Sequence, residues 1–265
     1  MSQLSFVDIH CHLVPGIDDG AKTAAETLAM ARMAADDGID TIICTPHQAG
    51  NHAANSGAMI RAAVKKTQRL LDERRIPLTL LPGGDVRIET DMIARLRRGD
   101  LLTLGDHGRH VLLELPHELY FPLEPVLRQL DRYEMVGILS HPERNQGILR
   151  QPEVLAPLIE AGCLMQVTAG SLCGSFGAEI RDFSEWMLAE GFAHFVATDA
   201  HGVDTRRPVM SEAFERVCDL ADENVAELLC CNNPAQVADG QDVKPGLVRV
   251  RRGLLASWFG WGKAS

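Results

Sequence analysis

Short apolar runs rich in β-branched residues alternate along this chain with longer segments of helical period. Runs such as Thr41-Ile42-Ile43-Cys44 are almost continuously apolar, as expected for parallel strands that are buried on both faces. A repeated strand and helix alternation therefore predicts a single α/β barrel with seven parallel strands. These strands are predicted at Phe6–His10, Thr41–Thr45, Leu78–Leu81, Val111–Leu115, Val136–Ser140, Leu164–Thr168 and Phe195–Thr198.

The clearest helix is predicted over Thr23–Asp37. Thr23 is a helix-capping residue, Glu26 completes a capping box three positions later, and Gly38 ends the segment. The remaining helices are predicted at Ser56–Arg75, Thr90–Arg98, Leu123–Glu134, Pro152–Ala161, Glu179–Glu190, Met210–Leu220 and Asn224–Cys231.

Composition supports one large core and limits the class of partner. A chain of 265 residues with 46% hydrophobic content can bury a single barrel core, which we place in residues 1–243, without a second domain. Its formal net charge of -10 and pI near 5.4 argue against a nucleic-acid partner, because phosphate backbones select basic surfaces.

Cysteine usage and the absence of long apolar runs predict a cytoplasmic protein. The seven cysteines include no Cys-x-x-Cys pair and follow no regular spacing, so we expect reduced thiols rather than a disulfide framework. The segment Met1–Val7 has neither a basic stretch nor a long apolar stretch, so no secretory signal is expected. No run approaches the roughly 18 to 20 apolar residues of a membrane-spanning helix.

Metal-capable side chains lie at or just after six of the seven predicted strand ends. The carboxyl ends of barrel strands meet at one rim, so these side chains are expected to converge there. Residues two apart on an extended backbone point to the same side, so His10 with His12, and Asp199 with His201, can each grip one ion. A nitrogen and oxygen ligand set without thiolates suits manganese, iron, zinc or magnesium. The six residues are His10, His47, Asp85, Glu114, His141 and Asp199.

This ordered pattern resembles the PHP superfamily, the polymerase and histidinol phosphatase group of metal-dependent phosphoesterases. Within it, the chain is most similar to the bacterial manganese-dependent protein-tyrosine phosphatases of capsule and exopolysaccharide operons. The resemblance implies a distorted (β/α)7 TIM-like barrel with a metal cluster at the carboxyl ends of its strands. It rests on Asp8-Ile9-His10-x-His12, Asp18-Asp19-Gly20, Thr45-Pro46-His47, Gly83-Gly84-Asp85, Leu113-Glu114, His141-Pro142-Glu143-Arg144, Asp199-Ala200-His201 and Asp204-x-Arg206.

The resemblance also implies which residues hold two to three divalent ions, most often manganese. One departure is Asp85, where the family usually has the longer glutamate, so either a shifted backbone allows the bridge between ions there or one ion is held less tightly. Asp19 lies in an Asp-Asp-Gly sequence that is also typical of ordinary turns. The implied sets are His10, His12, Asp85 and Asp199 for one ion, Asp85, Glu114 and His141 for a second, and Asp19, His47 and His201 for a third.

By the same resemblance, the activity would be hydrolysis of phosphotyrosine by a metal-activated hydroxide. Arg144 and Arg206 would bind the substrate phosphate, although surface ion pairs with Glu143 or Asp204 are an alternative use of them. His201 or Asp199 is a candidate proton relay. The implied partner is a phosphotyrosine-containing protein, a bacterial tyrosine kinase that controls polysaccharide export.

Two other functions stay open at this stage. One is a small-molecule phosphatase of the same superfamily, such as a histidinol-phosphate phosphatase, and the other is a non-catalytic adaptor that binds phosphorylated partners. A cysteine-dependent tyrosine phosphatase is excluded, because none of the seven cysteines begins a Cys-x5-Arg motif.

The last 22 residues differ from the rest, because Lys244–Ser265 contains five basic residues, no acidic ones, and the aromatic residues Trp258, Phe259 and Trp261. This tail could contact an anionic membrane surface at the inner face, or could pack against an acidic part of the domain. The histidines outside the pattern are expected on the surface or in loops, and Tyr120 and Phe121 are expected either to line the mouth of the site or to pack in an ordinary loop. These histidines are His52, His107, His110, His117 and His194.

Overall fold

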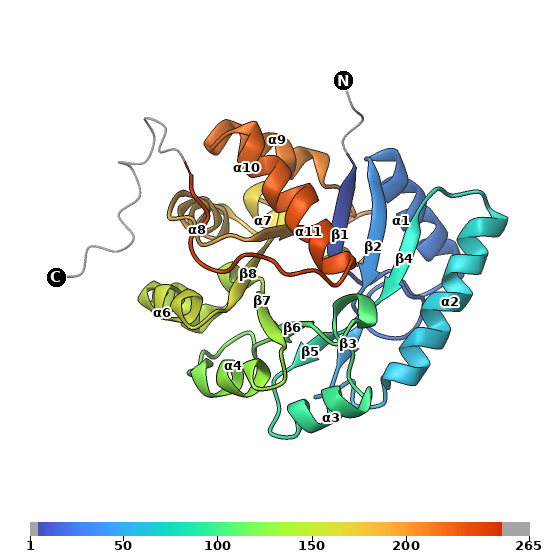
Figure 1. The fold of residues 1–265 in the computed structure, drawn as a ribbon. Helices are drawn as coiled ribbons and strands as arrows, with labels where there is room; N and C mark the ends of the chain where they lie inside the picture. The colour runs from blue at the N-terminus through green and yellow to red at the C-terminus, as the bar shows by residue number, and fades with distance from the viewer. Residues whose placement is uncertain (1–4, 251–265) are drawn as a thin grey trace.

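The computed structural model describes residues 5–250, and the strands in this range pair only in parallel. They form a three-stranded sheet in the order β1-β2-β4 and a six-stranded sheet in the order β3-β5-β6-β7-β8-β9 (Figure 1). The strands are β1 Phe6–Cys11, β2 Ile39–Cys44, β3 His47–Gln48, β4 Thr79–Pro82, β5 Asp85–Arg87, β6 His110–Glu114, β7 Val136–Ser140, β8 Leu164–Thr168 and β9 Phe195–Ala197.

All seven predicted strands are present, but β3 and β5 were missed. Each follows a longer strand with no helix between, so the prediction of strict alternation was wrong at these two places. Pro46, which lacks an N–H, interrupts the chain between β2 and β3, and Gly83 and Gly84 interrupt it between β4 and β5. A Cβ on Gly84 would lie 2.2 Å from the Gln48 side-chain oxygen, so glycine is required for this close approach.

The first and last strands are joined at their carboxyl ends. Asp199 donates its backbone N–H to the His10 carbonyl at 2.7 Å, and His12 donates its own to the Ala200 carbonyl at 2.9 Å. The buried carboxylate of Asp8 accepts hydrogen bonds from the Thr198 N–H and hydroxyl at 3.1 and 2.5 Å. These contacts link the two sheets at the rim where the metal-capable residues were predicted.

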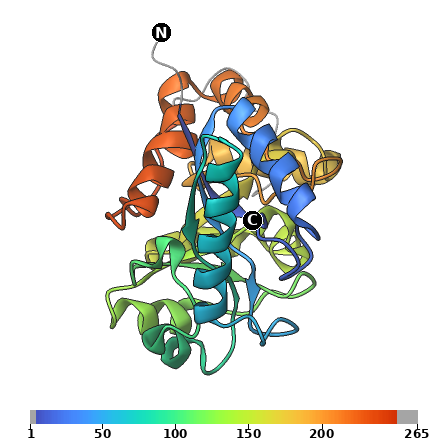
Figure 2. The same cartoon turned by 90° about the vertical axis from the view of Figure 1, so that its right-hand side faces the viewer.

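Helices lie outside the strands, with α1 beside β2 and α2 beside β4 (Figures 1 and 2). As predicted, Thr23 caps α1 by accepting a hydrogen bond from the Glu26 N–H. The helices are α1 Ala24–Asp36, α2 Gly57–Glu73, α3 Met92–Arg98, α4 Glu124–Asp131, α5 Gln146–Arg150, α6 Leu155–Glu160, α7 Ala169–Leu172, α8 Ala178–Ala189, α9 Ser211–Leu220, α10 Glu223–Glu227 and α11 Asn233–Ala238.

Several helix predictions need correction. The segment predicted as one helix from Pro152 to Ala161 begins with a 3₁₀ turn, Pro152–Val154, before α6. The helix predicted to end at Cys231 continues instead through a π-helical segment, Leu228–Asn232, into α11. The short helices α5 and α7 were not predicted, because five and four residues are too few to show a helical period.

Two apolar clusters fill the fold, one between the strands and a larger one between strands and helices. The inner cluster takes at least one buried side chain from most of the longer strands, so those strands are buried on both faces as their apolar sequences predicted. Its members on the strands include Ile9, Ile43, Leu112, Ile138, Leu164 and Phe195.

The first residues of the carboxyl-terminal tail pack against the domain. Val248 donates its N–H to the Gly191 carbonyl at 2.8 Å, and the ring nitrogen Nε2 of His194 lies 2.8 Å from the Gly246 carbonyl. The tail from residue 251 onward, including its aromatic residues, lies outside the described part of the chain. No helix in the described part is long and apolar enough to cross a membrane.

Two of the histidines expected on the surface or in loops are buried; His194 lies in the loop before β9, as expected, whereas His110 begins β6. His194 and His110 expose 0% and 1% of their surface. His194 has partners, because its Nδ1 accepts from the Met165 N–H at 3.1 Å while Nε2 donates to Gly246. Neither ring nitrogen of His110 has a hydrogen-bond partner within residues 5–250, and burial lowers its pKa from 6.5 to about 4.

We therefore expect His110 to reduce stability in acid. The unfolded chain takes up a proton near pH 6.5 and the folded chain only near pH 4, so stability is complete above pH 6.5 and falls as the pH drops towards 4. The difference between pH 7.5 and pH 5 is about 2 kcal/mol. His110→Phe should remove about that much of the pH dependence in urea unfolding of chelator-treated protein, whereas the exposed control His117→Phe should retain it. An equal pH dependence in all three proteins would contradict the assignment.

Candidate metal centre

All nine residues proposed as metal ligands from the sequence lie together at the carboxyl ends of the strands. Their ligand atoms fall into four overlapping groups, and within each group the atoms lie within 4.8 Å of one another. The groups are His10, His12 and Asp85; His10, His141 and Asp199; His47, Asp85 and Glu114; and His12, Asp19, His47 and His201.

The deepest part of the cluster is formed by His10, His12, Asp85 and Asp199, which are all buried. The Nε2 atom of His10 lies 3.2 Å from Asp199 Oδ1 and 3.8 Å from Asp85 Oδ2. The Nε2 atom of His12 lies 3.4 Å from the same Asp199 oxygen. The four residues expected around a first ion therefore converge.

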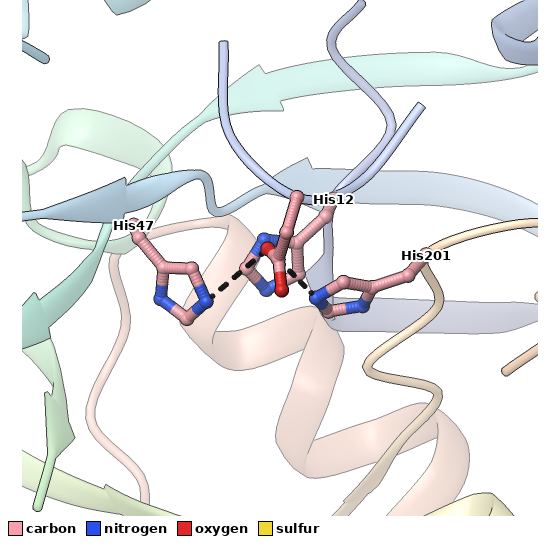
Figure 3. A group of neighbouring side chains, drawn as sticks. His12, His47 and His201 are labelled. Carbon is pink, nitrogen blue, oxygen red and sulfur yellow. Dashed lines mark ion pairs between the residues drawn. The ribbon is translucent and has the colours of Figure 1, made fainter. Parts of the chain in front are cut away.

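The shallowest group is built around Asp19, whose Oδ1 lies 3.4 Å from His47 Nε2 and 3.2 Å from His201 Nε2. Figure 3 shows the rings of His12, His47 and His201 converging from separate segments of the chain. Asp19 is about half exposed, so this group faces solvent. It contains the whole set expected around a third ion, with His12 in addition.

The set expected around a second ion is divided between two groups. Glu114 lies with Asp85 and His47, whereas His141 lies with His10 and Asp199. The short side chain of Asp85 is turned to His47, with 3.1 Å between Asp85 Oδ2 and His47 Nδ1. The pairing of β3 with β5 places His47 opposite Asp85, and no pattern in the sequence predicted that pairing.

Neighbouring polar groups fix the orientation of three imidazole rings. The Nδ1 atom of His10 lies 2.9 Å from Gln166 Oε1, that of His12 lies 2.7 Å from Asp18 Oδ2, and that of His201 lies 2.9 Å from the Asp199 carbonyl. When Nδ1 donates in each case, Nε2 presents its lone pair to the interior of the cluster, as a metal ligand requires. Gln166 was not predicted as a site residue, and Asp18 was weighed only as part of a turn.

Protons and cations compete for this cluster. Burial disfavours a charge on His12, but hydrogen bonds to Asp18 and Asp199 outweigh it and raise the pKa of His12 to about 10. Burial lowers the pKa of His10 to about 4 in spite of the carboxylates of Asp199 and Asp85. Burial and the nearby charge of Asp85 raise the pKa of Glu114 to about 7. A cation that binds here must displace the His12 proton, so its affinity should fall in acid.

The donor atoms at the centre fit divalent cations. Both carboxylate oxygens of Asp85, and Oδ1 of Asp199, are buried without a hydrogen-bond partner among the described residues. The Nε2 atoms of His10 and His12 are only 3.2 Å apart, so their two lone pairs repel unless a proton or cation lies between them. Buried charges of this kind are normally paired or coordinate a metal.

Two arginines border the cluster, and both contact Asp199. Arg144 and Arg206 each place a guanidinium nitrogen on Asp199 Oδ2, at 2.6 and 2.5 Å, rather than pairing with Glu143 or Asp204. His141, Asp199 and Arg206 all have positive φ values, of 34°, 50° and 50°. Strained backbone of this kind is common at functional sites, where it turns side chains into a position that regular structure would not give.

The centre opens into a pocket of about 200 Å³ that contains both arginines and His117 in its lining, together with Asp19, His47, Glu114, Leu115, Ser140, His141, Asn145 and Asp199. Tyr120 and Phe121 do not line it, so of the two roles weighed for them the mouth of the site is wrong and loop packing is correct. The aromatic side chain near the arginines is Phe176, whose ring centre lies 4.8 Å from the Arg144 guanidinium carbon.

Thiols do not take part in this site. Burial raises the pKa of Cys11, which lies between His10 and His12 in sequence, well above its usual range. Burial and the charge of Glu212 raise the pKa of the exposed Cys173 to about 11. Neither thiol is therefore ionised near neutral pH, in agreement with the absence of a Cys-x5-Arg motif.

A family model for capsular polysaccharide synthesis proteins, CpsB/CapC, matches residues 6–239. The chain belongs to this family. The family predicted from the ordered motifs is thereby confirmed.

Curated relatives support the same assignment. The chain is 38% identical over 210 residues to the tyrosine-protein phosphatase YwqE of Bacillus subtilis. This alignment covers 78% of this chain and 82% of YwqE. It is 31% identical over 205 residues to the putative tyrosine-protein phosphatase CapC of Staphylococcus aureus, and that alignment covers 77% of this chain and 80% of CapC.

Solved structures agree with this result. The crystal structures of YwqE from Bacillus subtilis and CpsB from Streptococcus pneumoniae, described as metal-dependent tyrosine phosphatases, include a chain that superposes with a TM-score of 0.86 at 34% identity. The match covers 93% of this chain and all of that one. An N-isopropylammelide isopropylaminohydrolase from Burkholderia multivorans matches with a TM-score of 0.51 over 91% of this chain and 76% of its own, but at 16% identity it shares the fold alone.

The role of Gln166 can be tested through metal affinity. Gln166→Leu removes the acceptor that orients His10, so the affinity for Mn²⁺ in calorimetric titration should fall about 10- to 100-fold. The exposed control Gln151→Leu should bind Mn²⁺ like the unmodified protein. Unchanged affinity in Gln166→Leu, with an unchanged melting temperature, would show that Gln166 does not position the ring.

Proposed function

We propose that this protein is a metal-dependent protein-tyrosine phosphatase that acts in the cytoplasm on a phosphorylated protein of capsule or exopolysaccharide synthesis. The observation that carries the proposal is the convergence of nine imidazole and carboxylate side chains beside two arginines, in a chain of the CpsB/CapC family. Curated relatives named tyrosine-protein phosphatases support the substrate class. A bacterial tyrosine kinase of the same system is the partner we propose.

The donor set suits two or three divalent ions, and manganese is our first choice because nitrogen and carboxylate oxygen ligands predominate. His10, His12, Asp85 and Asp199 would hold the deepest ion, and Asp19, His47 and His201 the most exposed one. Asp85, Glu114 and His141 are proposed for a further ion, with His47 close enough to assist. Bound there, the ions would lower the pKa of a coordinated water and polarise a phosphoryl oxygen.

The arginines would bind the substrate phosphate. In the structure both guanidinium groups are held at the pocket by one oxygen of Asp199, which leaves further N–H groups of each fork free to meet a phosphate. Arginine suits this role because it is always charged and can donate two parallel hydrogen bonds.

The tyrosine phenolate is a good leaving group. A phenolate leaving group has a conjugate acid pKa near 10, so it needs less help from a general acid than a serine alkoxide does. We propose His201 or Asp199 as the candidate proton relay; His201 lies close to both Asp19 and Asp199, and its Nε2 could exchange a proton only while that atom is not bound to a cation.

We also propose how the two sheets and the end of the chain are organised around this site. The two parallel sheets, joined by the contacts between β1 and the residues after β9, would act as one distorted seven-unit barrel that presents the ligands. Residues 1–243 would form the catalytic unit, and the basic segment 244–265 would be an appended tail.

Metal removal provides the main test. Purified protein loaded with Mn²⁺ should hydrolyse p-nitrophenyl phosphate and a phosphotyrosine peptide, and should lose both activities on chelation and recover them when Mn²⁺ is restored. Alkylation with iodoacetamide should leave p-nitrophenyl phosphate hydrolysis intact. Histidinol phosphate should be a poor substrate. Activity that survives chelation, or that alkylation abolishes, would refute the proposal, and phosphopeptide binding without turnover would favour an adaptor.

Loss of a phosphate-binding arginine should affect turnover rather than metal content. Arg206→Ala should reduce kcat/KM for p-nitrophenyl phosphate by about 10²-fold, the effect of removing one well-placed donor to a developing charge. The amount of Mn²⁺ bound per chain, measured by elemental analysis, should not change. The exposed Arg181→Ala is the matched control and should behave as the unmodified protein. Near-normal kcat/KM in Arg206→Ala would rule out the assigned role.

A further inference from the structure

A second and larger cavity adjoins the metal pocket. It has a volume of about 660 Å³, and Arg206 lines both cavities, so the two adjoin at this side chain. We call it the flanking pocket. Its lining consists of Ala169, Gly170, Cys173, Ser175, Phe176, Thr198, Val203, Asp204, Thr205, Arg206, Arg207, Val209 and Glu212.

The volumes of the two cavities indicate that each would hold a different part of a substrate. Pockets for organic ligands usually enclose about 300–1,000 Å³. The metal pocket, at about 200 Å³, has room for the phosphate and its immediate surroundings but not for a tyrosyl residue and its neighbours in a peptide. The flanking pocket lies within the range and adjoins the side chain of Arg206, which would bind the phosphate.

Phe176 marks the junction of the two cavities. Its ring lines the flanking pocket, and it lies 4.8 Å from the guanidinium carbon of Arg144, which lines the metal pocket. An aromatic ring carried by a phosphate held between Arg144 and Arg206 would therefore leave the metal pocket beside another aromatic ring. Such pairs contribute about 0.5–1.5 kcal/mol beyond the area that they bury.

The charged side chains that line the flanking pocket balance one another, which favours an uncharged occupant. Two arginines, Arg206 and Arg207, are balanced by Asp204 and Glu212, and Arg207 already lies 3.5 Å from Glu212. Between these charges the lining combines the apolar side chains of Phe176, Val203 and Val209 with small polar ones from Ser175, Thr198 and Thr205. A strongly acidic or basic peptide would gain nothing from this balance, whereas an aromatic or aliphatic side chain would gain apolar contacts.

We propose that the flanking pocket binds the peptide next to the phosphotyrosine, with an uncharged aromatic or aliphatic residue seated against Phe176 and Val209. It is thus the part of the site that distinguishes a phosphotyrosine protein from a small aryl phosphate. This inference rests on the proposed phosphatase function, and it assigns specificity to Phe176 and Val209, which are among neither the proposed metal ligands nor the proposed phosphate-binding residues.

Cys173 allows the pocket to be filled without touching the catalytic residues. It is exposed, it follows α7, and it lines the flanking pocket but not the metal pocket. Cys173→Trp should place an indole in the pocket, and Cys173→Ser is the matched control that keeps the space open. Equal melting temperatures of both variants and the unmodified protein would show that the fold is intact.

The kinetic test compares p-nitrophenyl phosphate, free phosphotyrosine and a phosphotyrosine peptide with aromatic and aliphatic neighbours. The unmodified protein and Cys173→Ser should favour the peptide over free phosphotyrosine in kcat/KM by about tenfold, a typical effect of one apolar pocket contact. Cys173→Trp should lose this preference through a higher KM for the peptide and keep its rate on p-nitrophenyl phosphate. Equal effects on all substrates, or none, would overturn the pocket assignment. Failure of every protein to hydrolyse any aryl phosphate would instead refute the proposed function.

A protection experiment provides a second readout that needs no turnover. At pH 8.5, N-ethylmaleimide should label Cys173 more slowly when a non-hydrolysable phosphonate analogue of the peptide is bound, and inorganic phosphate should give no protection. The partly buried Cys218 and Cys231 do not line the pocket and serve as internal references. Protection by phosphate alone, or equal protection of all three thiols, would contradict peptide binding in this pocket.

Discussion

The structure depends on one electrostatic constraint, which is that buried carboxylates at the strand ends need positive charge. Asp85 and Asp199 lie at the centre of the fold with oxygens that no described hydrogen-bond donor satisfies. Ionised groups are costly to bury. Arg144 and Arg206 pair with Oδ2 of Asp199, but Oδ1 of Asp199 and both oxygens of Asp85 face imidazoles, which can offset their charge only by taking up protons. Divalent cations would neutralise both carboxylates and let the imidazoles bind as neutral ligands, so the folded state and the chemistry of the site share the same requirement.

The surrounding residues are arranged to serve that centre. Gln166 and Asp18 orient imidazole rings, and Asp8 joins the first strand to the segment that carries Asp199. Beyond them, Arg206 belongs to both the metal pocket and the flanking pocket, so the same side chain that would bind phosphate also begins the surface proposed for the peptide. Substrate choice would therefore be altered separately from the chemistry only by mutating residues that line the flanking pocket alone, such as Cys173.

Much of the fold and the candidate ligand set could be predicted, because parallel strands have continuous apolar sequences and their polar ends must meet. The strands β3 and β5 could not, because two or three residues after a proline or a glycine pair show no periodicity. Gln166 is one amide within an apolar strand, and its contact with His10 spans 156 positions of sequence. Phe176 lies in a loop rich in glycine and serine, so its place beside Arg144 depends on tertiary structure alone. His110 gave no sign of burial because histidine is common on surfaces.

The most direct test of this account is anomalous diffraction from crystals grown with excess Mn²⁺. Two or three manganese peaks are expected at the carboxyl ends of the strands, with one of them in contact with His10, His12 and Asp199. Crystals with no manganese at this rim, or with these side chains turned away from one another, would contradict it.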